Sequence, residues 1–102
     1  MLGGLQIDAD EGQVVQFCRD HRIKRLWVFG SVLRRDFRPD SDVDVLVEFD
    51  DGAEVSLWAL AGIQLELGDL LGRPVDLVER ESLRNPFRRR EILRTSRLIY
   101  AA

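Results

Sequence analysis

Two short stretches of the sequence carry residues suited to phosphate and metal chemistry. Gly30-Ser31 follows an apolar run, and Ser41-Asp42-Val43-Asp44 opens another. A glycine lets the backbone approach a phosphate closely, and the free N–H groups at the start of a helix attract its charge. Two aspartates one residue apart on a strand point to the same face, with Cα atoms roughly 6.5–7 Å apart. The aspartates can therefore converge on metal ions, and the two stretches together indicate nucleotide chemistry.

A third aspartate and an arginine extend this set. Asp76 lies inside the apolar run Val75-Asp76-Leu77-Val78, where a buried charge is costly unless it is paired or bound to a metal. Arg34 comes three residues after Ser31, so the two share a face if a helix begins there. Each residue also has an ordinary structural explanation: a turn for Ser41 and Asp42, a helix cap for Ser31, a surface cation for Arg34 and an ion pair with a C-terminal arginine for Asp76.

Apolar periodicity and capping residues predict the elements that position these side chains. A helix capped by Asp8 or Asp10 is expected to run to about His21, with Val14, Phe17 and Cys18 on one face. Strands are predicted at 23–29, 42–49, 75–78 and 98–100. Further helices are predicted at 31–37, at 55–71 with Gly72 as its stop, and from the cap Asn85-Pro86 to about 94.

The hydrophobic pattern of three predicted elements suggests how each is covered. In the strand at 23–29, the run Leu26-Trp27-Val28-Phe29 is apolar on both faces, as expected of a central strand that is covered twice. In the strand at 42–49, Val43, Val45 and Val47 face one way, and the other face carries Asp42, Asp44, Leu46 and Glu48. The helix at 55–71 is apolar over more than one stripe, so it is either deeply buried or offers surface to a partner.

Length and composition predict one globular domain spanning 1–102. The chain is 45% hydrophobic and 32% charged, which suits a soluble protein, and no apolar run reaches the ~20 residues of a membrane helix. The first residues lack a signal-peptide pattern, so a cytoplasmic location is the default expectation. Cys18 is the single cysteine, which excludes an internal disulfide and a thiolate zinc cage and favours a buried structural thiol. His21 is expected at a helix end or on the surface rather than in catalysis.

The net charge of −3 conceals an uneven distribution. Seven acidic residues and no basic one lie between Asp40 and Glu54, whereas seven arginines lie between Arg80 and Arg97. Solvated surface explains such runs most simply, but a metal site can use the first, and an anionic partner or an acidic protein surface the second. Nucleic-acid binding is not expected, because the chain is acidic overall and the arginines lack interleaved aromatic residues.

The ordered set of motifs resembles the minimal nucleotidyltransferases of the polymerase-β-like superfamily. It consists of Gly30-Ser31, Arg34, Ser41-Asp42-x-Asp44 and the later Val75-Asp76-Leu77-Val78, and the resemblance runs from about 26 to 100. It implies an α+β fold, a small mixed sheet with helices packed on it. Members commonly have a small residue before the arginine and a glycine after it, where this chain has Leu33 and Arg35. That departure can crowd the substrate side but leaves the aspartates untouched.

The resemblance also implies a reaction and roles for these residues. Asp42, Asp44 and Asp76 would hold Mg²⁺, with two ions about 3.5–4 Å apart, and Asp76 would ligate the second ion or accept a proton. Gly30, Ser31, Arg34 and Ser41 would bind the triphosphate of ATP. AMP would pass to a hydroxyl, typically a tyrosine of a HEPN-domain toxin that the family member neutralises as its antitoxin.

Three hypotheses of different classes remain at this point. The chain is a magnesium-dependent protein adenylyltransferase, a non-catalytic antitoxin that neutralises its partner by binding alone, or an enzyme that modifies a small molecule. The last is disfavoured because such enzymes carry a second domain for the acceptor. A chain of 102 residues has no room to enclose the acceptor, so a partner or a second copy is expected to contribute, through the helix at 55–71 or the arginine-rich end.

Overall fold

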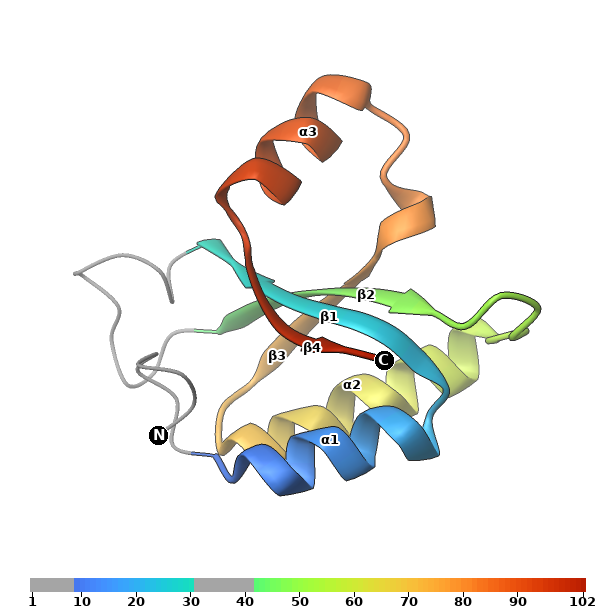
Figure 1. The fold of residues 1–102 in the computed structure, drawn as a ribbon, viewed down its shortest axis with the longest axis vertical. Coiled ribbons are helices and arrows are strands. Elements are labelled where there is room, and N and C mark those ends of the chain that lie inside the picture. Colours follow the sequence, from blue (N-terminus) through green and yellow to red (C-terminus); the bar gives the residue numbers. More distant parts are fainter. Residues whose placement is uncertain (1–8, 31–41) are drawn as a thin grey trace.

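Two helices lie side by side against one face of a four-stranded sheet, and a third helix stands away from the opposite face (Figure 1). The computed structural model describes residues 9–30 and 42–102. Its elements follow in the order α1 (Glu11–Asp20), β1 (Ile23–Phe29), β2 (Val43–Phe49), α2 (Leu57–Leu71), β3 (Val75–Glu79), the short 3-10 helix η2 (Arg80–Ser82), α3 (Pro86–Thr95) and β4 (Arg97–Ala101). The predicted α+β class is confirmed, and the predicted helix at 31–37 lies outside the described residues.

Local capping explains where the helices begin and end. The carboxylate of Asp10 accepts hydrogen bonds from the backbone N–H groups of Gly12 and Gln13 at 2.7 and 3.2 Å, which starts α1. Asn85 caps α3 in the same way, with proline at the first position. Gly72 ends α2 with φ of 70°, a left-handed conformation that glycine adopts without strain. These predicted boundaries are confirmed.

The sheet has the strand order β3-β2-β1-β4 and mixed pairing. β1 is antiparallel to both β2 and β4, whereas β2 and β3 are parallel. A parallel pair needs a crossover connection, and α2 provides it. The two strands that carry the predicted aspartates are therefore direct neighbours in the sheet.

The hydrophobic core lies between the sheet and the pair α1 and α2. Val43, Val45 and Val47 of β2 are fully buried there, as the alternation of the strand predicts. From α1 the buried residues are Val14, Phe17 and Cys18. Burial raises the pKa of the Cys18 thiol to about 12, so Cys18 is the inert structural cysteine that its neighbours predict.

The opposite face of the sheet is only partly covered, which corrects one expectation for β1. The strand is central, as predicted, but Arg25, Trp27 and Phe29 are half-buried rather than enclosed. The described helices that contact the core lie on the other side, and α3 projects away from this face (Figure 1). The partly open face is the one that carries the aspartates.

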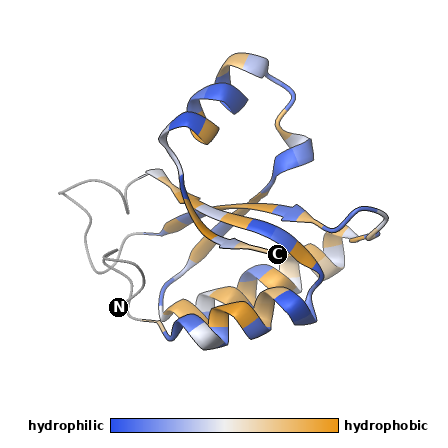
Figure 2. Ribbon diagram, in the orientation of Figure 1, coloured by the Kyte–Doolittle hydropathy of each residue, from blue (hydrophilic) through white to orange (hydrophobic). Residues whose placement is uncertain are grey.

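Helix α2 is buried on one side only, so the alternative of a deeply buried helix is wrong. Its inner side buries Ile63, Leu67 and Leu71 against the sheet. Much of the helix is coloured as hydrophobic in Figure 2, and Leu57, Trp58 and Leu65 are exposed. In the part of the chain that the structure describes, no helix is long and apolar enough to cross a membrane.

Candidate functional site

Asp44 and Asp76 occupy matching positions on neighbouring strands. They are register partners in the parallel pair of β2 and β3, so their side chains leave the same face of the sheet. Adjacent strands lie about 4.8 Å apart, which brings the two carboxylates within reach of a common ligand. Asp44 is half-buried and Asp76 is exposed. The expected burial cost at Asp76 therefore does not arise, because its side chain lies on the face of the sheet that α1 and α2 do not cover.

Gly30 packs its backbone directly against Asp44. Phe29, the last residue of β1, pairs with Asp44, and Gly30 then turns away with φ of +77°. A Cβ atom at Gly30 would collide with Oδ2 of Asp44. Glycine is thus required here twice, once by the backbone conformation and once by the carboxylate that lies against it. The predicted link between the Gly-Ser turn and the aspartates is present at this contact.

Asp42 lies one residue before β2 and is exposed. Within residues 9–30 and 42–102, no three His, Cys, Asp or Glu side chains lie close enough together to hold a metal ion. The strand register joins Asp44 to Asp76 but does not fix Asp42, which precedes the hydrogen-bonded ladder. Ser31, Arg34 and Ser41, the predicted phosphate ligands, lie outside the described residues.

The carboxylates of Asp44 and Asp76 are the kind of oxygen donor that a hard cation binds. Carboxylate oxygens are the ligands that Mg²⁺ prefers, and the close approach of Gly30 leaves no side chain between β1 and Asp44. Asp44 and Asp76 therefore have the donor chemistry that a magnesium ion requires, although residues 9–30 and 42–102 form no group of three such side chains.

A buried carboxylate on the same face was not predicted as functional. Glu48 is only 8% exposed and accepts hydrogen bonds from Arg25 at 2.6 Å and from Arg80 at 2.7 Å. Burial alone would raise the pKa of Glu48, but the two guanidinium groups outweigh it and the pKa is lowered. Its position in the alternating set with Asp44 was the signal available in the sequence.

The ion cluster formed by Glu48, Arg25 and Arg80 lies beside the ring of Trp27. The guanidinium carbon of Arg80 lies 6.0 Å from the centre of the Trp27 ring, at the outer limit of a cation–π contact. Trp27 pairs across the strands with Leu46 and Leu98. The Nε atom of Arg80 is buried without a hydrogen-bond partner among the described residues. Arg80 follows β3 directly, so its contacts tie the end of the strand that carries Asp76 to the centre of the sheet.

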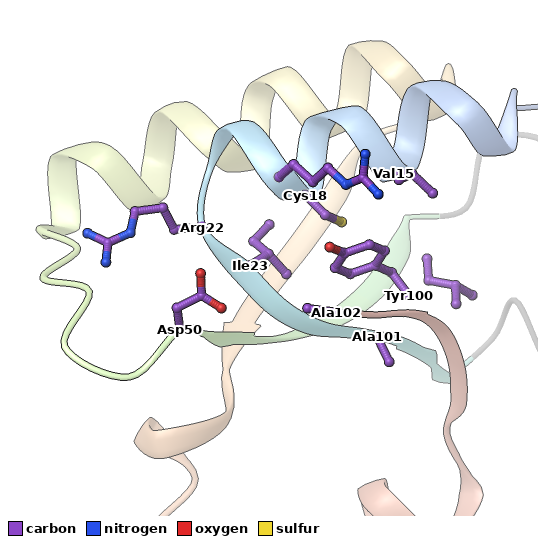
Figure 3. A pocket seen from close by; sticks show the side chains of 10 residues that line it. Val15, Cys18, Arg22, Ile23, Asp50, Tyr100, Ala101 and Ala102 are labelled. Atoms are coloured by element: carbon purple, nitrogen blue, oxygen red, sulfur yellow. The ribbon is translucent and has the colours of Figure 1, made fainter.

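A cavity of about 650 Å³ lies elsewhere, between α1 and the C-terminal strand (Figure 3). Cys18, Ile23 and Tyr100 line it, and Asp50 and Arg22 lie at one side. Ile23 begins β1, whereas Gly30 follows its last residue. The cavity is therefore at the opposite end of the strand from Asp44 and is not part of the candidate site.

Comparison with known proteins supplies the family. The sequence profile of the nucleotidyltransferase domain matches residues 12–99. A protein of Methanocaldococcus jannaschii, named as a candidate protein adenylyltransferase, is 33% identical over 79 residues, which cover 78% of this chain and 83% of that protein.

Two solved structures show the same fold. One, described as a candidate minimal nucleotidyltransferase, has a TM-score of 0.69 at 39% identity and covers 85% of this chain and 86% of that one. A chain from the structure of a tri-AMPylated HEPN toxin of Shewanella oneidensis in complex with its MNT antitoxin has a TM-score of 0.65 at 18% identity. That match covers 90% of this chain and 70% of the other, and at this identity it shows the fold alone. The chain belongs to the nucleotidyltransferase domain family, and the predicted family and enzyme class are confirmed.

Proposed function

We propose that the chain transfers AMP from ATP to a hydroxyl group of a partner protein, a tyrosine of a HEPN-domain toxin, and thereby acts as its antitoxin. The observation that carries this proposal is the pairing of Asp44 with Asp76, with the backbone of Gly30 against the Asp44 carboxylate. The family relation supports nucleotidyl transfer. The name of the Methanocaldococcus relative and the AMP-modified toxin of Shewanella support AMP and a HEPN acceptor.

The predicted site residues would have different roles in this reaction. Asp42, Asp44 and Asp76 would hold magnesium, which supplies charge neutralisation to the triphosphate. Gly30, Ser31, Arg34 and Ser41 would bind the phosphates through backbone N–H, hydroxyl and guanidinium groups. The acceptor oxygen forms a bond to the α-phosphorus, the bond to the β-phosphate oxygen breaks, and pyrophosphate leaves. Asp76, which is exposed, would take the proton of the attacking hydroxyl.

A binding-only antitoxin is the second candidate function. It is favoured by Leu33 and Arg35, which stand where members of the family commonly have a small residue and a glycine. In that case the same fold neutralises the partner by forming a complex.

The experiment that separates the two uses ATP labelled at the α-phosphate and a HEPN-domain toxin as the acceptor. For the enzyme, the native chain labels the toxin in the presence of magnesium, and EDTA stops the labelling. Asp44→Ala and Asp76→Ala are each expected to reduce labelling by at least 100-fold while complex formation is retained.

Absence of labelling by the native chain, with full neutralisation by Asp44→Ala, would establish the binding-only antitoxin instead. Transfer of label to a small molecule but not to the protein would overturn the assigned acceptor.

A further inference from the structure

The outer side of α2 is apolar, although it faces away from the sheet. Leu57, Trp58 and Leu65 are exposed to 84%, 90% and 71%. Ala61 is exposed between them, at positions that bring all four residues onto one side of the helix. We call Leu57, Trp58, Ala61 and Leu65 the α2 stripe. Figure 2 colours much of α2 as hydrophobic.

The neighbouring helix shows that this apolarity is particular to α2. α1 lies beside α2 in the same layer. Apart from Gly12, its exposed residues are polar, namely Glu11, Gln13, Gln16, Arg19 and Asp20. Among residues 9–30 and 42–102, nothing buries the α2 stripe.

The charged residues of α2 and of the segment before it are all acidic. From Asp51 to Gly72 the chain contains no basic residue. Asp51 and Glu54 precede the helix, and Glu66 and Asp69 lie in its second half, all four exposed. His21 contacts Glu66 at 2.8 Å and Lys24 lies 3.9 Å from Asp51, but those two acidic side chains remain 59% and 99% exposed. Both ends of the α2 stripe are therefore acidic.

This charge pattern selects the occupant. If the α2 stripes of two copies packed together, acidic groups would meet acidic groups in either helix orientation, which is unfavourable. A basic border on the opposing surface removes that repulsion and pairs the charges. We propose that the α2 stripe docks a helix of another protein, whose apolar face is bordered by lysine or arginine side chains.

The position of the α2 stripe gives the complex a defined geometry. α2 covers one face of the sheet, whereas Asp44 and Asp76 leave the other face. A protein docked on the α2 stripe therefore leaves the candidate site accessible. The docking surface does not depend on the proposed reaction.

The test uses the full chain and two synthetic amphipathic helices with the same leucine face, one bordered by lysine and one by glutamate. Because Trp58 is exposed, its fluorescence is expected to shift to the blue when the lysine helix binds, and Trp58→Phe should remove this change. Calorimetry is expected to give at least tenfold tighter binding of the lysine helix than of the glutamate helix. Leu65→Ser should weaken that binding at least tenfold.

Matched variants test the specificity of the surface. Gln16→Ser, an exposed change on α1, should leave binding unchanged, and Glu66→Lys combined with Asp69→Lys should reverse the preference between the two helices. Thermal melts followed by circular dichroism check that each variant is folded. Equal affinity for both helices, or unchanged binding by folded Leu65→Ser, would overturn the proposal. Self-association of the chain that Leu65→Ser abolishes would overturn it as well, by making a second copy the occupant.

Discussion

Gly30 is the residue at which backbone conformation and the candidate site meet. Its φ of +77° is left-handed, and its Cα lies where any Cβ would strike the Asp44 carboxylate. Gly52 has a similar φ of +80° but open space around it. Substitutions at the two glycines therefore separate the free-energy cost of a left-handed backbone from the cost of a clash with the Asp44 carboxylate.

Replacing Gly30 by alanine is expected to lower the free energy of unfolding by about 2–3 kcal/mol, because strain and a steric clash add. Gly52→Ala, with strain alone, should cost about 1 kcal/mol. Urea unfolding followed by circular dichroism measures both. Equal costs for the two variants would show that Asp44 moves aside freely.

Cys18 offers a test of burial at a single atom. Since its side chain is enclosed and its pKa is raised to about 12, the thiolate fraction at pH 8 is very small. The native protein should react with a disulfide reagent such as DTNB at least 100-fold more slowly than the protein unfolded in urea. Rapid reaction of the native protein would indicate that α1 opens readily from the core.

At the scale of elements, the sequence predicted what is determined locally. The caps Asp10 and Asn85 and the stop Gly72 placed the helix ends, because each acts on backbone groups within a few residues. The alternation of β2 correctly gave its buried face. Gly30, Asp44 and Asp76 could be chosen from the order of the motifs alone.

Features that depend on contacts between residues far apart in the sequence could not be predicted. Asp76 was expected to be costly to bury, but it lies exposed on the face of the sheet that α1 and α2 leave uncovered. The contact of Arg25 and Arg80 with Glu48 joins residues from three separate segments, and no local pattern specifies it. The roles of Ser31, Arg34, Ser41 and Asp42 remain predictions.

The ion cluster of β1, β2 and η2 should make stability depend on acid pH. The pKa of Glu48 is lowered in the folded chain, so its contribution is complete above the unfolded value of about 4.3 and is lost as pH falls through the folded value. Glu48→Gln is expected to cost about 2 kcal/mol at pH 7, since two guanidinium groups lose their charged partner. The difference from the native chain should shrink as pH falls below about 4.3.

Urea unfolding at several pH values measures this dependence, with Glu54→Gln as the exposed control that changes little. A constant difference between Glu48→Gln and the native chain over that range would contradict the assigned role of the carboxylate.

Across the whole molecule, stability is distributed unevenly. The core joins the sheet to α1 and α2, whereas the buried residue of α3 is Ile92 alone, and the helix stands away from the sheet (Figure 1). Segments with few buried apolar contacts open at low free energy. The third helix should therefore behave as a separate, weaker unit.

Native-state hydrogen exchange is expected to show this directly. Amides of α3 should exchange at least 100-fold faster than those of β1 and β2, which lie in the middle of the sheet. Equal protection of α3 and β1 would mean that the helix unfolds only with the whole domain.

The strand order has one practical consequence for work with inactive variants. β3 is an edge strand, and Asp76 is an exposed negative charge between Val75 and Leu77 on it. Charges on edge strands prevent the unpaired backbone of one molecule from joining that of another. Asp76→Ala therefore removes a gatekeeper against aggregation together with the proposed proton acceptor. Light scattering should show more self-association for Asp76→Ala than for Asp44→Ala, which lies on an inner strand. Asp44→Ala is therefore the better inactive variant for experiments in cells.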